Sequence, residues 1–165
     1  MDSSGTPEHR QVVRSSPLWR VPRESAHAVV RARRQVTETL CAWGLPHLVD
    51  DAAVVVSELT TNALRHGVGP VWHTLRVVLV AGGYAVHVVV GDRGRGWGAR
   101  AGEPVTAAEG TSGRGLMIVA ALSSAWGSTR SHAGHLVWAD LPTAVPGGGG
   151  GRSTADSTRA SAAAA

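Results

Sequence analysis

The spacing of apolar residues changes once along the chain, and this change limits the folds that 165 residues can adopt. In the first part apolar residues recur every three or four positions. This spacing predicts one helix between Pro22 and Gly44 and a second over Leu48–Arg65. Beyond residue 70 the period falls to two, in valine-rich runs at Val71–Ala81 and Tyr84–Gly91. Two glycines separate these runs, which is typical of a hairpin.

Shorter signals complete the predicted architecture. They predict an edge strand at Gln11–Ser16, a helix at Leu116–Leu122, and a last hairpin made by Trp126–Ser131 and His135–Leu141. The order is strand, two helices, two strands, helix, two strands. Because the paired runs are joined as hairpins, we expect an α+β two-layer sandwich: a mostly antiparallel sheet with helices on one face.

Composition predicts one folded domain with two polar ends. We expect a flexible N-terminus over 1–10, one domain over 11–142, and a disordered tail rich in Gly, Ser and Ala over 143–165. The apolar runs are far shorter than the roughly 20 residues of a membrane helix, and the N-terminus has no signal-peptide pattern. We therefore expect a cytoplasmic protein without a membrane partner.

The basic residues exclude several kinds of chemistry. All 16 are arginine, so a Walker A phosphate loop and a lysine Schiff base are both ruled out.

The single cysteine excludes an internal disulfide and a multi-cysteine zinc site. The net charge of +4 is spread along the chain, whereas nucleic-acid binders gather charge on a stripe with aromatics. We do not expect nucleic acid as a direct partner.

Three polar side chains fall on one stripe of the second predicted helix. Glu58, Asn62 and His66 follow one another at steps of four residues. The amide oxygen of Asn62 is a hard, neutral ligand for Mg²⁺, and a carboxylate such as Glu58 can deprotonate an attacking hydroxyl. The alternative for this stripe is a polar helix surface that faces solvent.

Asp92 directly follows an apolar run, at the end of a predicted strand. A carboxylate is costly to bury without a partner, and here it could accept a hydrogen bond from an exocyclic amine such as that of adenine. Gly94 and Gly96 would allow the backbone to approach a ligand closely. The alternative is a plain turn capped by aspartate.

Gly113-Arg114-Gly115 precedes the third predicted helix. Free N–H groups at a helix start favour anions, and Arg114 would add positive charge for a triphosphate. The alternative is a flexible loop, and no parallel βαβ pattern supports a dinucleotide-binding fold. The glycine-rich segment Trp97–Ser112 has the length of a functional lid over a nucleotide, with simple disorder as its alternative.

Together the motifs resemble the ATP-binding domains of the GHKL group, which includes gyrase and histidine kinase ATPases and shares the Bergerat fold. The resemblance covers about Pro17 to Pro142 and is greatest to the anti-sigma-factor serine kinase branch. The residues that match the family's asparagine box and two glycine boxes are Glu58, Asn62, Asp92, Gly94, Gly96, Gly113, Gly115 and Leu116.

This resemblance implies an ATP site. Asn62 would hold Mg²⁺ at the phosphates, Asp92 would bind the adenine amino group, and Glu58 would act as the base on the incoming hydroxyl. The other residues implied around the nucleotide are Arg65 and His66 in supporting roles, Gly94 and Gly96 at the base, and Gly113, Arg114, Gly115 and Leu116 at the phosphates.

The resemblance also implies an activity and partners. The chain would be an ATP- and Mg²⁺-dependent protein serine/threonine kinase that binds a sigma factor or an anti-sigma-factor antagonist and phosphorylates the antagonist. It would thereby regulate transcription through sigma-factor sequestration. The second interpretation is a non-catalytic module whose bound nucleotide gates a protein partner. Glu58 favours catalysis, because binding alone needs no base. A homodimer is compatible with the family, although no residue pattern indicates one.

The chain departs from the family branch at two places. Arg95 stands where the branch often has Pro, and His135 and Leu136 stand where it often has Lys and Thr. His132 and His135 are spaced like metal ligands, but they flank a predicted tight turn and no third ligand is near in sequence. We expect both to be solvated turn histidines.

Overall fold

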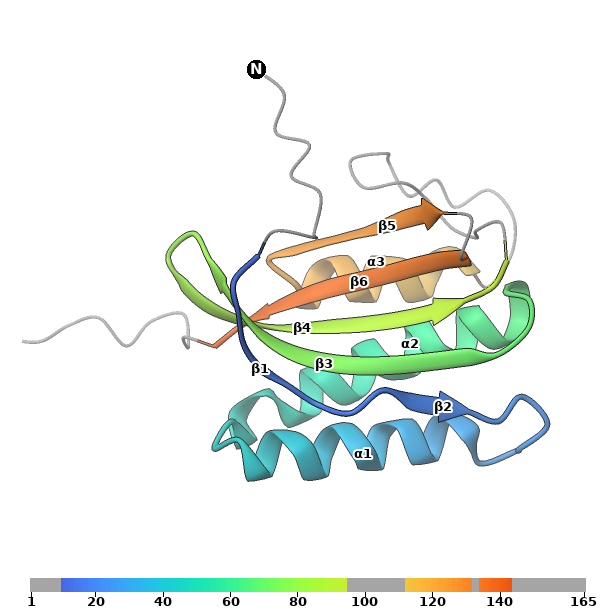
Figure 1. Ribbon diagram of the computed structural model, residues 1–165, viewed down its shortest axis with the longest axis horizontal. Coiled ribbons are helices and arrows are strands. Elements are labelled where there is room, and N and C mark those ends of the chain that lie inside the picture. Colours follow the sequence, from blue (N-terminus) through green and yellow to red (C-terminus); the bar gives the residue numbers. More distant parts are fainter. Residues whose placement is uncertain (1–9, 95–111, 132–133, 144–165) are drawn as a thin grey trace, which may run out of the picture.

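The computed structural model of the chain describes residues 10–94, 112–131 and 134–143 (Figure 1). Its strands form one antiparallel sheet in the order β1-β3-β4-β6-β5, with β2 also paired to β3. The elements are β1 (Val12–Ser15), β2 (Trp19–Val21), α1 (Ala28–Ala42), a 3₁₀ turn (Pro46–Leu48), α2 (Val49–His66), β3 (Val71–Val80), β4 (Gly83–Asp92), α3 (Ser112–Leu122), β5 (Ala125–Ser131) and β6 (Gly134–Pro142).

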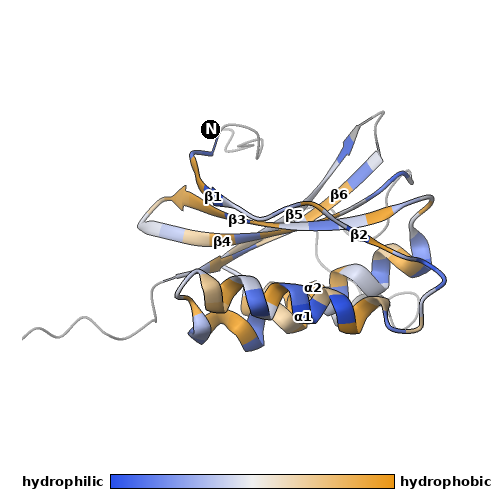
Figure 2. Cartoon of the chain, turned by 60° about the horizontal axis from the view of Figure 1, so that its bottom comes forward, coloured by the Kyte–Doolittle hydropathy of each residue, from blue (hydrophilic) through white to orange (hydrophobic). Residues whose placement is uncertain are grey.

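The helices cover one face of this sheet (Figure 2). The α+β two-layer architecture predicted from the sequence is therefore confirmed. None of the helices in the described ranges combines the length and the apolar character needed to cross a membrane.

The core lies between the sheet and α2, which runs through the middle of the helical layer. Leu59 of α2 and Val88 of β4 are fully buried there, together with Leu40 of α1. Alternate residues of β4 and β6 face this core, because side chains alternate between the faces of a strand. Asp92 and His135 share that phase with Val90 and Val137, so both are placed on the helix-facing side of the sheet.

The structure differs from the sequence-based expectation at three elements. The first helix begins at Ala28 rather than just after Pro22, because Ser25 forms a turn whose carbonyl accepts the Ala28 N–H at 3.0 Å. The three-residue strand β2 is too short to show a period, and it was not predicted. The third helix begins at Ser112, so the glycines expected to precede it lie in its first turn.

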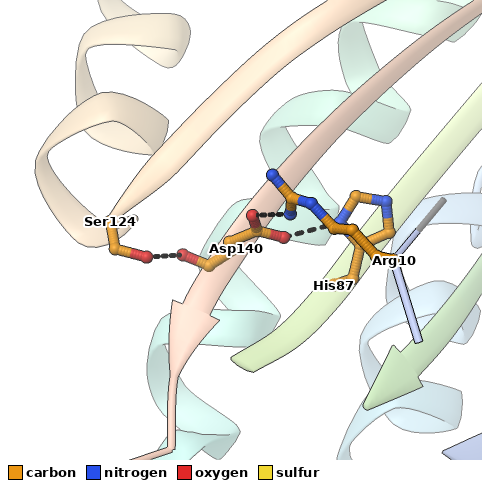
Figure 3. A network of polar contacts seen from close by, with 4 residues as sticks. All are labelled: Arg10, His87, Ser124 and Asp140. Atoms are coloured by element: carbon orange, nitrogen blue, oxygen red, sulfur yellow. Dashed lines mark hydrogen bonds and ion pairs between the residues drawn. The ribbon is translucent and has the colours of Figure 1, made fainter. Parts of the chain in front are cut away.

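A buried ionic network occupies the opposite face of the sheet (Figure 3). The carboxylate of Asp140 accepts hydrogen bonds from Arg10 and from His87 Nδ1, the latter at 2.6 Å. Although burial opposes it, these two partners hold the pKa of Asp140 below its usual value. Ser124 donates its hydroxyl to the Asp140 carbonyl, and the Arg10 guanidinium lies 5.1 Å from the ring centroid of Trp138. The network thus fastens residue 10 to β4 and β6.

Candidate functional site

Helix α2 carries the first predicted motif, with Glu58 half-buried, Asn62 buried and His66 exposed. Asn62 is only 4% exposed, and its Nδ2 has no hydrogen-bond partner among the described residues. Leaving a buried amide unsatisfied is costly, so such a group is expected to meet a ligand. Since amide oxygen and nitrogen are assigned by their partners, either atom of Asn62 could face that ligand. The residue therefore fits a metal–phosphate group chemically.

Glu58 lies one turn before Asn62 and is half-buried. Its carboxylate meets α3: a Cβ atom built on Gly115 would overlap Glu58 Oε2. Any side chain at position 115 would displace this carboxylate. The close approach of the two helices thus places the predicted base directly beside the first turn of α3.

The first turn of α3 can receive an anion. The first N–H groups of a helix have no acceptor within the helix, and the helix dipole favours negative charge at this end of α3. Arg114 is exposed in this turn, whereas Leu116 is buried in the core and anchors the helix. The structure thus keeps Gly113, Arg114 and Gly115 at the helix start and assigns the Leu116 side chain to packing.

Asp92 closes the other end of the site. The residue is 3% exposed, and Oδ1 accepts the backbone N–H groups of Val68 at 3.2 Å and Gly94 at 2.6 Å. A Cβ atom built on Gly67 would lie 2.6 Å from Asp92 Cγ. The loop that follows α2 therefore packs directly on this carboxylate, so the C-terminal end of α2 lies next to Asp92.

Arg23 holds that loop in place. Its guanidinium donates to the carbonyls of Ala63 and Leu64, each at 2.9 Å, and to those of Gly67 and Gly69. These contacts satisfy carbonyls that the end of a helix leaves without partners. Arg23 lies just after Pro22, where the first helix was predicted to begin. Local patterns do not reveal its contacts, because each joins residues that are forty or more positions apart.

A family model described as a histidine kinase-like ATPase domain matches residues 21–141. The chain belongs to this family. No curated protein matches it. The matched range contains every site residue discussed above, and an ATPase domain implies an ATP-binding site. The GHKL resemblance is thereby confirmed at the level of the superfamily.

In this ATPase domain His135 differs from expectation. It was predicted to be a solvated turn histidine, but it is 1% exposed, and its Nδ1 lies 3.7 Å from Asp92 Oδ2. The prediction was wrong because Asp92 and His135 are register partners in β4 and β6. Burial lowers the pKa of the His135 imidazole, against the opposing effect of Asp92. His135 lies two residues before the apolar Val137, on the same face of the strand, and this spacing was the sequence signal for its burial.

The remaining predicted residues of the ATPase domain are exposed or lie outside the described ranges. Arg65 and His66 are exposed in the last turn of α2. Gly96 and Arg95 lie outside the described residues, as does the predicted lid except for Ser112, the first residue of α3.

Proposed function

We propose that this ATPase domain is a protein serine/threonine kinase of the anti-sigma-factor type. It would transfer the γ-phosphate of ATP to a serine or threonine of an anti-sigma-factor antagonist and regulate transcription through sigma-factor sequestration in the cytoplasm. The activity would reside in residues 11–142. The observation that carries this proposal is the contact between the half-buried Glu58 and Gly115 in the first turn of α3.

The contact between Glu58 and Gly115 brings a carboxylate that can act as a base next to the N-terminus of α3, where an anion can bind. In the proposed reaction the substrate hydroxyl oxygen attacks the γ-phosphorus, the bond from that phosphorus to the β,γ-bridging oxygen breaks, and ADP leaves. Glu58 accepts the hydroxyl proton. Asn62 would hold Mg²⁺, which would neutralise phosphate charge. An open cavity of about 390 Å³ also reaches Glu58, and the rest of its lining lies on α1 and α2, with Arg33 and Ser57 among it.

The decisive experiment is incubation with γ-labelled ATP, Mg²⁺ and candidate antagonist proteins, followed by mapping of the labelled residue. We expect label on a serine or threonine of one antagonist. Tight nucleotide binding that changes the affinity for a partner, with no label transferred, would contradict the kinase and support nucleotide-gated partner binding instead.

Asp92 should provide most of the adenine recognition. In Asp92→Asn an NH₂ group replaces one carboxylate oxygen and the negative charge is removed. The charge-assisted hydrogen bond to the exocyclic amine is therefore lost. We expect nucleotide binding to weaken by about 1–3 kcal/mol, measured by titration calorimetry. Glu24→Gln removes the same charge from an exposed position and serves as the control. An unchanged dissociation constant in Asp92→Asn would remove Asp92 from the adenine site.

A further inference from the structure

Asp92 and His135 form a buried pair at the proposed adenine end of the site. Each side chain is 1% exposed, and Asp92 Oδ2 lies 3.7 Å from His135 Nδ1. The other carboxylate oxygen, Oδ1, accepts two backbone N–H groups. The carboxylate is thus held from one side by the loop after α2 and from the other side by an imidazole.

The hairpin leaves His135 little freedom to move away. Gly134 adopts φ +139°, and a Cβ atom there would overlap the carbonyl oxygen of Asp92. The chain therefore passes directly against the Asp92 backbone immediately before His135. A change in the charge of this imidazole must consequently act on the carboxylate beside it.

We propose that His135 is a positioning residue for Asp92, and that protonation of His135 weakens the binding of adenine nucleotides. The proposal rests on the adenine role of Asp92 proposed above. With a neutral imidazole, the carboxylate is oriented by its backbone donors and can accept from the exocyclic amine. An imidazolium would attract Oδ2 into a buried ion pair and compete with that amine for it.

The charges around the pair set the direction of the effect. Asp92 acts on His135 from β4 and favours its charged form, whereas Arg130, its register partner on β5, disfavours it. On the elements packed nearby, Arg65 and His66 of α2 and Arg114 of α3 are exposed.

Burial has the largest effect on His135 and lowers its pKa. In the folded protein His135 is therefore protonated only at a pH below 6.5, the ordinary histidine pKa. Nucleotide affinity should be highest at neutral pH and should fall on acidification.

The test is calorimetric titration of the full chain with ADP at about pH 7.5, 6.5 and 5.5. His135→Asn keeps an N–H group near the position of Nδ1 but cannot titrate. His27→Asn, at an exposed position, is the matched control. The phosphate of ADP also titrates in this range, but it does so equally for every variant. Ratios between variants therefore isolate His135.

We expect wild type and His27→Asn to lose more affinity than His135→Asn between the neutral and the acidic condition, by a factor below about ten, which is the value that a midpoint at the ordinary 6.5 would give. Parallel profiles would overturn the role of His135. Absence of ADP binding to wild type at neutral pH would instead overturn the proposed function.

A measurement on the unmodified protein guards against a variant that fails to fold. The His135 imidazole can be titrated by NMR with and without ADP. We expect its midpoint to lie below 6.5 and to fall further when ADP is bound. A midpoint that ADP leaves unchanged would overturn the proposal.

Discussion

Replacing Glu58 with glutamine should leave ATP binding nearly unchanged and slow phosphoryl transfer by about 10²- to 10⁴-fold, the usual contribution of a general base. Glutamine has the shape of glutamate and preserves the packing against Gly115, but it cannot accept the hydroxyl proton. The loss should therefore appear in the transfer rate at saturating ATP, measured as label incorporated into the antagonist.

The control for this result is Glu24→Gln, which removes an exposed carboxylate outside α2 and should transfer phosphate at the wild-type rate. Calorimetry of ATP binding to both variants separates catalysis from binding. If Glu58→Gln transferred phosphate as fast as wild type, Glu58 could not be the base, and the main support for a kinase would be gone.

Strong periodicity is what allowed much of the fold to be predicted. The apolar spacing of α2 and the valine alternation of β3 and β4 each extend over ten residues or more, and their predicted bounds differ from the observed ones by only one residue. Local signals were less informative where tertiary contacts decide the outcome. The strand β2 has three residues, too few to show a period, and exists because it pairs with β3.

The site shows the same division between local and distant information. Spacing alone places Glu58 and Asn62 on one stripe of a helix, because both residues lie on α2. No local pattern reveals that Gly115 will touch Glu58 or that Arg23 will cap the end of α2, since each contact joins distant segments. The burial of His135 is likewise hidden from local patterns, because it depends on which residue of β4 pairs with His135 in the sheet.

His73 illustrates this dependence on distant partners in the core. It lies on β3 and is fully buried, with its Nε2 3.0 Å from Oε1 of Gln35 on α1 and its ring 5.0 Å from that of Trp19. A neutral imidazole can donate one hydrogen bond to the Gln35 carbonyl. Burial in this position lowers the pKa of His73 from 6.5 to about 4.

The lowered pKa of His73 should make the folded state acid-sensitive. The unfolded chain gains the proton below pH 6.5, whereas the folded protein gains it only near pH 4. Above pH 6.5 His73 is neutral in both states and costs no stability. As the pH falls from 6.5 to about 4, only the unfolded chain gains the proton, and the free energy of unfolding decreases by about 3 kcal/mol. In His73→Gln, which can still donate to Gln35 but has no titrating group, this part of the loss should disappear.

Urea unfolding followed by tryptophan fluorescence at several pH values between about 7 and 4 measures this difference. Carboxylates and the other histidines titrate in wild type and variant alike, so the difference between the two unfolding free energies isolates His73. His27→Gln, at an exposed site, should follow the wild-type curve. If the curve of His73→Gln also ran parallel to that of wild type, His73 could not be the buried neutral group that limits stability in acid.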